Sequence, residues 1–211
     1  MISETDESLR TLVRRDVLNG TKIDVSFDAP TQDWAAKRQG PAINLYLYDV
    51  HEDLQRRPGQ FVEHRDERRR VVDRTLPPRR FKLSYLITAW TQRPEDEHRL
   101  LAALLACFLS FDGLPREVLQ GALAEQDEAI RTTIGLPLPP ERSLSDVWTA
   151  LGGQLKPSLS LVVTVPFPPL LPRQQPVGPP VRQPRIAVQG AGGQVEEVGR
   201  RTHDESGAGA R

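Results

Sequence analysis

The spacing of apolar side chains predicts alternating helices and strands up to about Phe167. Leu9, Leu12 and Val13 contribute to one apolar stripe, which predicts an amphipathic helix over residues 2–19. A proline followed by three acidic residues and a leucine-rich face predicts the clearest helix, residues 94–110. Shorter helices are predicted over residues 31–40, 114–123 and 143–152. Period-two alternation or short apolar runs predict strands over residues 21–30, 41–50, 81–90, 129–138 and 159–167.

This order of elements indicates an α+β fold. A mixed, largely antiparallel sheet with helices packed on one face would bury the apolar patterns. Residues 51–60 form a polar loop in this interpretation, and residues 61–80 form a charged, exposed β-excursion. We expect residues 1–166 to form one domain, since a chain of about this length buries roughly 70% of its unfolded surface.

Proline and glycine dominate the chain beyond Phe167. Eight prolines fall within residues 166–184, which favours extended polyproline geometry over a packed core. The remainder is polar and glycine-rich, with one short candidate strand at residues 186–189. We therefore expect residues 167–211 to form an extended or disordered C-terminal arm.

The charge balance argues against nucleic acid as a partner. The 211 residues include 28 basic and 28 acidic ones, whereas nucleic-acid-binding domains usually carry a basic excess. The single cysteine, Cys107, permits no internal disulfide and favours a reducing compartment. No apolar run reaches the roughly 18 residues of a membrane helix, and the polar N-terminus is unlike a signal peptide. These features predict a cytoplasmic protein without membrane insertion.

No motif in the sequence predicts catalysis. The chain lacks a Walker loop, a dinucleotide-binding glycine motif and a nucleophile elbow. The HED triplet at residues 51–53 is more typical of a solvated loop than of a metal site. Cys107 falls in a leucine-rich helical pattern, which predicts a buried structural thiol. We expect a non-enzymatic protein with no cofactor and no metal.

An arginine-rich stretch is a candidate protein interface. Its acidic residues are few, and its basic residues are Arg65, Arg68, Arg69, Arg70, Arg74, Arg79 and Arg80. One interpretation is a solvated charged hairpin. The other is a contact with an acidic partner protein, in which Pro77 and Pro78 fix the entry into the next strand. The second hypothesis predicts that glutamates at positions 68–70 disrupt this contact without unfolding the chain.

Two further features are candidate interface elements. Tyr46 and Tyr48 lie on the polar side of their strand, where they serve either core packing or a subunit contact. In the arm, Ile186 and Val188 would add a strand to a neighbouring subunit's sheet if the arm orders on assembly. Otherwise the arm is a linker or an unstructured end.

Three separated segments carry a resemblance to a known family. They are SFD at residues 26–28 with Pro30 and Trp34, NLYLYD at residues 44–49, and LSYLITAW at residues 83–90 followed by Glu97, His98 and Leu100. In this order they closely resemble the cap, or tail-terminator, proteins of extracellular contractile injection systems, including the antifeeding prophage and the Photorhabdus virulence cassettes. The resemblance covers about residues 1–166 and includes no motif of the arm.

This resemblance implies a structural role. Proteins of the family form a six-fold ring that ends the inner tube of a phage-tail-like particle and anchors the last sheath layer. It implies a homo-oligomer whose partners are the inner tube protein and the sheath protein, in a particle that is released or stays in the cell. The alternative function is a non-enzymatic adaptor that binds a partner protein through its proline-rich tail.

Overall fold

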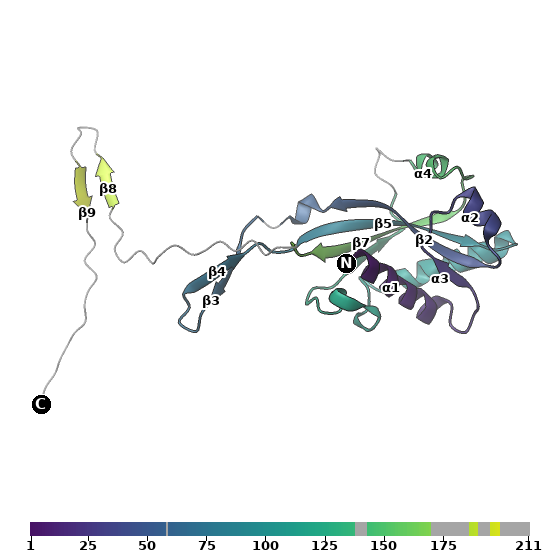
Figure 1. Cartoon of the computed structure of the whole chain (residues 1–211), viewed down its shortest axis with the longest axis horizontal. Helices are drawn as coiled ribbons and strands as arrows, with labels where there is room; N and C mark the ends of the chain where they lie inside the picture. Colours follow the sequence, from purple (N-terminus) through teal and green to yellow (C-terminus); the bar gives the residue numbers. More distant parts are fainter. Residues whose placement is uncertain (58, 138–142, 170–185, 190–194, 199–211) are drawn as a thin grey trace, which may run out of the picture. The chain divides into compact units, whose positions relative to one another are not determined.

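A computed structural model describes residues 1–57, 59–137 and 143–169, and the backbone of residues 186–189 and 195–198 (Figure 1). The chain divides into two compact units. The first unit comprises residues 1–62 and 75–174, and the second comprises residues 63–74 and 175–211.

The first unit is built on a five-stranded sheet. Its elements are α1 (Ile2–Leu12), β1 (Asp24–Ser26), α2 (Gln32–Lys37), β2 (Ala42–Glu52), β5 (Arg79–Trp90), α3 (Pro94–Leu109), β6 (Arg131–Ile134), α4 (Leu144–Ala150) and β7 (Ser158–Phe167). The strand order is β1-β2-β5-β7-β6. The short β1 runs parallel to β2, and the other neighbours are antiparallel. The predicted α+β fold with a mixed, largely antiparallel sheet is confirmed.

The main hydrophobic core lies on one face of this sheet. Strand β5 is central and contributes Leu83, Tyr85 and Ile87, which are fully buried. Helices α1 and α3 cover this face (Figure 1), and their apolar stripes supply core residues such as Leu9 and Leu104. Each such side chain contributes about 1.5–3 kcal/mol on burial. The two helices predicted from their apolar stripes therefore cover the expected face.

Helix α1 also buries polar groups that the apolar pattern did not predict. Thr5 and Ser8 are fully buried, and their hydroxyls bond to the carbonyls of Met1 and Glu4 at 2.8 and 2.7 Å. Ser8 Oγ also accepts a hydrogen bond from the backbone N–H of Gln120. This contact attaches the segment that follows α3 to the first helix.

That segment corrects one sequence prediction. Residues 114–123 were predicted as one short helix, but they form two 3₁₀ turns, Arg116–Val118 and Gly121–Leu123. Gly121 has φ +54°, and an added Cβ would lie 2.8 Å from Cγ of Glu4. The left-handed glycine interrupts the helix and lets the chain approach α1 closely.

The opposite face of the sheet carries a second, smaller buried region. Helix α4 lies on this side in Figure 1, and its Trp148 is 2% exposed. A capping box of Ser143 and Asp146 begins the helix, as the serine three residues before an acid predicts. Leu86 of β5 is also buried outside the main core. The helix therefore protects part of the second face.

Strands β3 (Val62–Arg65) and β4 (Val71–Thr75) form a two-stranded hairpin, most of which belongs to the second unit. Its β3 residues are exposed, as predicted for the charged excursion. Strands β8 (Ile186–Gln189) and β9 (Val195–Val198) form another antiparallel hairpin. The predicted extended arm at residues 170–185 lies outside the described residues.

Candidate interaction surfaces

The segments that carry the family resemblance meet at one end of the sheet. Ser26 of β1 is in register with Asn44 of β2, which is in register with Thr88 of β5. Ser26 Oγ donates to Asp28 Oδ2 at 2.7 Å, and Asn44 Nδ2 donates to the Asp28 carbonyl at 2.9 Å. Trp34 Nε1 donates to the same carboxylate oxygen at 3.2 Å. Asp28 thus joins the end of β1 to α2 and β2.

Trp90 lies at the centre of an aromatic and cationic cluster. The rings of Trp34 and Trp90 meet edge to face, with centroids 5.3 Å apart. Lys156 Nζ lies 4.8 Å and the Arg38 guanidinium 5.8 Å from the Trp90 ring. Lys156 also pairs with Glu97 of α3. These contacts connect α2, β5, α3 and the segment before β7, and each contributes about 0.5–2 kcal/mol to stability.

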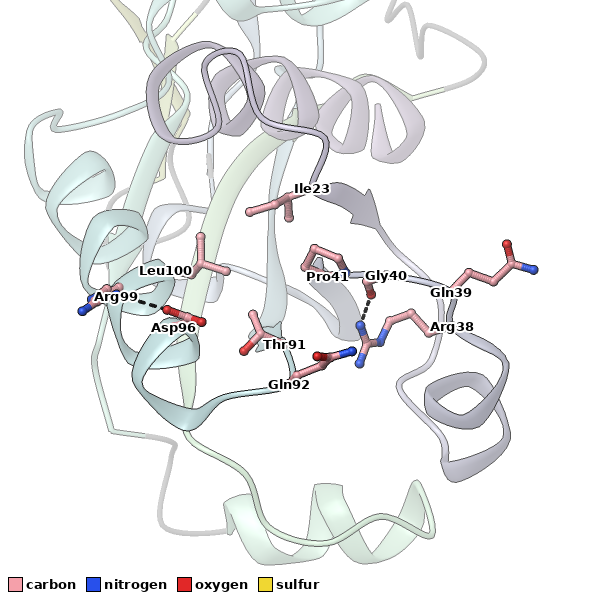
Figure 2. A pocket seen from close by; sticks show the side chains of 10 residues that line it. All are labelled: Ile23, Arg38, Gln39, Gly40, Pro41, Thr91, Gln92, Asp96, Arg99 and Leu100. Atoms are coloured by element: carbon pink, nitrogen blue, oxygen red, sulfur yellow. Dashed lines mark hydrogen bonds and ion pairs between the residues drawn. The ribbon is translucent and has the colours of Figure 1, made fainter.

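A cavity of about 680 Å³ is lined partly by Arg38 of this cluster and partly by the start of α3 (Figure 2). Figure 2 shows Arg38 directed at the Gly40 carbonyl and Asp96 facing Arg99, and the latter pair is 3.1 Å apart. Both guanidiniums are therefore already engaged. The walls combine hydrogen-bonding groups with apolar side chains such as Leu100, a composition suited to contact with a polypeptide.

The HED triplet does not form a single site. His51 Nδ1 pairs with Asp49 at 2.8 Å, and Glu52 pairs with Arg57 at 3.5 Å. Asp53 is 4% exposed and faces Lys82 at 3.4 Å. Among the residues that the structure describes, no group of three His, Cys, Asp or Glu side chains is placed to hold a metal ion. No helix in the same part of the chain is long and apolar enough to cross a membrane.

Three of the predicted arginines are paired within the β3–β4 hairpin. Arg65 and Arg74 both bind Glu63, at 2.6 and 2.9 Å, and these contacts lower the pKa of Glu63. Arg70 pairs with Asp66 at 2.9 Å. Hydrogen bonds from the backbone and side chain of Arg70 lower the pKa of Asp66. These pairs are exposed, so they orient the side chains more than they stabilise the hairpin.

The tip of this hairpin presents two arginines that, unlike the previous three, have no ion-pair partner among the described residues. The guanidiniums of Arg68 and Arg69 are exposed and make no hydrogen bond or ion pair with any described residue. The turn closes through Arg69 N–H to Asp66 O at 2.8 Å and Asp66 N–H to Arg70 O at 2.9 Å. Arg69 has φ +60°, a conformation in which glycine is usual in this type of turn. The hairpin therefore displays two unpaired cations at its tip.

Arg79 and Arg80 belong to the other unit. They begin β5, where Arg79 pairs with Glu52 at 3.7 Å and Arg80 pairs with Glu128. The seven arginines predicted as one stretch are therefore distributed over two units, and the role of each in an interface remains a prediction.

Tyr46 and Tyr48 line a groove against α4. The groove has a volume of about 380 Å³, and its other lining residues are Ser143, Asp146, Val147, Ala150 and Leu151. Both tyrosines are half-buried, and their hydroxyls make no hydrogen bond with a described residue. We call this feature the tyrosine groove. The sequence predicted that the two rings share a side of the strand, but not that a helix lies beside them.

Ile186 and Val188 belong to a strand, as predicted for residues 186–189. This strand pairs within the chain, with Ile186 opposite Val198 and Val188 opposite Glu196. The second strand of this hairpin was not predicted, because its sequence, VEEV, is short and half acidic. Addition of Ile186 and Val188 to a neighbour's sheet stays a prediction.

One titratable pair joins α1 to the central strand. The hydroxyl of Tyr85, fully buried, donates to Asp6 Oδ1 at 2.7 Å. Burial raises the pKa of Asp6 above its ordinary value of 3.8, although the Tyr85 hydrogen bond lowers it in part. Burial and the neighbouring Asp6 raise the pKa of Tyr85 as well. Elsewhere, burial raises the pKa of Cys107 to about 11, so this thiol is not activated.

We expect Asp6→Asn to remove part of the pH dependence of stability. Because the pKa of Asp6 is higher in the folded chain, the free energy of unfolding decreases as the pH rises above about 4 through that pKa. Asparagine still accepts the Tyr85 hydrogen bond but carries no charge. Urea midpoints between pH 4 and 8 should fall less steeply for the variant, and parallel curves for the two proteins would contradict this account.

Comparison with known proteins now identifies the family. The sequence matches the family model described as the Pvc16 N-terminal domain over residues 4–183. The chain belongs to this family. The predicted resemblance to cap proteins of the Photorhabdus virulence cassette type is thereby confirmed. No curated protein sequence matches the chain significantly.

Solved structures share the fold of this family member. One is the sheath/tube terminator of PVC, an extracellular contractile injection system, in its extended state, with 24% identity and a TM-score of 0.60. Another is the tube-terminating cap of the anti-feeding prophage, with 23% identity and a TM-score of 0.55. The likeness covers 90% and 89% of this chain but only 66% and 62% of those chains. The chain thus spans just under two thirds of their length.

Proposed function

We propose that this chain is a structural cap of a phage-tail-like contractile injection system, which ends the inner tube and anchors the last sheath layer. The observation that carries the proposal is the family match over residues 4–183. The shared fold with a sheath/tube terminator and a tube-terminating cap supports it. The adaptor alternative has no comparable support.

The proposed cap is a homo-oligomer, a hexameric ring, with the inner tube and sheath proteins as partners. In a closed ring each subunit uses one face against a different face of the next subunit. Complementary charges on one chain suit this arrangement, since the numbers of acidic and basic residues are equal. Repetition around the ring multiplies contacts that are individually modest.

The proposed role requires surfaces rather than a reaction. We infer a non-enzymatic protein that assembles in the cytoplasm as part of a particle, with residues 1–166 as the main domain and residues 167–211 as an arm. The unpaired arginines at the hairpin tip and the Trp90 cluster are the proposed contact elements on the two units. The tip offers charge for register and specificity, and the cluster offers aromatic area.

A tube-growth experiment tests the proposed function. Purified inner tube protein of the same particle is polymerised with and without the chain, and tube lengths are measured by negative-stain electron microscopy. We expect substoichiometric amounts of the chain to shorten the tubes and gold-labelled chain to sit at one end of each. Unchanged lengths, or label spread along the tube walls, would contradict the cap function.

A further inference from the structure

We propose that the tyrosine groove binds the proline-rich segment 168–173 of a neighbouring copy of this chain. This inference rests on the proposed function, because it names one contact between subunits of the ring. The segment reads Pro-Pro-Leu-Leu-Pro-Arg and follows directly after the last strand of the sheet. The chemistry and charge of the groove, and the length of chain between β7 and the segment, support this segment as the ligand.

The groove has the features of a polyproline-binding surface. Such surfaces present aromatic rings side by side, together with polar groups that bond the exposed peptide carbonyls. Tyr46 and Tyr48 are two residues apart on β2, so their positions are about 7 Å apart along the strand. A Pro-x-x-Pro pair in polyproline geometry spans about 9 Å. The two phenol hydroxyls lack partners among the described residues and are available as donors.

Charge favours the same ligand. Residues 166–185 contain three arginines and no acidic residue, and each Pro-x-x-Pro pair is followed closely by an arginine. Pro169 and Pro172, called the first motif here, directly precede Arg173, and Pro176 and Pro179, called the second motif, precede Arg182 by a few residues. The charged side chain in the groove lining is that of Asp146 at the start of α4. An arginine of the ligand would therefore meet a carboxylate at one end of the groove.

The register of the sheet separates the first motif from the groove of its own subunit. Phe167 is opposite Arg79 on β5, whereas Tyr46 is opposite Leu86. Seven residues along β5 correspond to about 23 Å. Pro169 follows Phe167 by two residues and reaches at most about 7 Å. Pro169 therefore cannot enter the groove of its own subunit, and the first motif can place both prolines only in the groove of another copy, which is the occupant that we propose.

The test uses three variants of the full chain. Tyr46→Ser with Tyr48→Ser removes the rings, Pro169→Ser with Pro172→Ser alters the first motif, and Pro176→Ser with Pro179→Ser alters the second motif as a matched control. Self-association is measured by sedimentation over a range of concentrations. We expect the first two variants to raise the dissociation constant at least about tenfold and the control to leave it unchanged.

A mixing experiment separates a contact between copies from one within a copy. The tyrosine variant keeps an intact arm and the Pro169/Pro172 variant keeps an intact groove, so a mixture of the two should form dimers and no larger species. A synthetic peptide of residues 166–175 should dissociate the oligomers of the unaltered chain. This peptide measurement stays decisive if the tyrosine variant fails to fold.

Three results would overturn the inference. They are a mixture that stays monomeric, a control variant as defective as the first-motif variant, and a peptide without effect. The tube-growth assay on the same variants separates this inference from the cap function. If the tyrosine variant ends tubes normally, the groove contact is not needed for the cap, and the cap function itself is supported. If the chain self-associates through the groove but has no effect on tube length, the groove contact would stand and the cap function would be contradicted.

Discussion

Glutamates in place of Arg68 and Arg69 are expected to abolish capping while the chain stays folded. These two guanidiniums are exposed and lack partners in the described part of the chain, so no contact of the isolated chain is lost with them. The double substitution reverses two charges, so the net charge at the tip changes by four units. Reversed charges placed against an acidic partner surface cost several kcal/mol, which corresponds to a loss of affinity of more than a hundredfold.

Particle length measured by electron microscopy, together with thermal unfolding of the purified chain, checks this result. The matched control is Arg116→Glu with Arg131→Glu, which makes the same charge change at two exposed sites of the other unit, outside the Trp90 cluster. Arg70 is left in place because it pairs with Asp66 within the turn. Particles of normal length with the Arg68/Arg69 variant, or an equal defect in the control, would refute the role of the hairpin tip.

The second large effect is expected at Trp148. Truncation to alanine should lower the free energy of unfolding by about 3–5 kcal/mol, because a buried indole is removed and a cavity remains. Trp148 is 2% exposed and is the buried residue of α4, so its loss should also detach the helix and disrupt the tyrosine groove.

Urea unfolding of the variant measures this effect. The Trp148 Nε1–H is buried without a hydrogen-bond partner in the described residues, so Trp148→Phe removes no hydrogen bond and should cost much less than the alanine variant. An alanine variant that unfolds within about 1 kcal/mol of the unaltered chain would show that α4 contributes little to the second face.

Local hydrophobic patterns predicted the structure correctly where one face of a helix or strand packs against the main core. The stripes of α1 and α3 and the alternation around Leu83, Tyr85 and Ile87 predicted both the elements and the buried face. The prediction was wrong for residues 114–123, because the left-handed Gly121 and the close approach to Glu4 depend on α1, which is distant in sequence. Hydrophobic periodicity carries no information about such an approach.

For the candidate interaction surfaces, too, the sequence predicted some features and not others. The sequence alone indicated an arginine-rich hairpin, a pair of tyrosines on one side of a strand, and a family resemblance that the family match confirms. It did not indicate that Arg65, Arg70 and Arg74 have partners while Arg68 and Arg69 have none among the described residues, because this pairing depends on the turn and on the register of β3 and β4.

The sequence by itself therefore determined most of the elements, the fold class and the family, since these depend on residue order and periodicity. The tertiary structure decided which charges are neutralised, which aromatic rings meet at Trp90, and that α4 turns two strand tyrosines into a groove. Many of these features arise from side chains that are far apart in the sequence, as the bond between Ser8 and Gln120 illustrates. Their distances are set by the packing of whole elements, and no local segment encodes them.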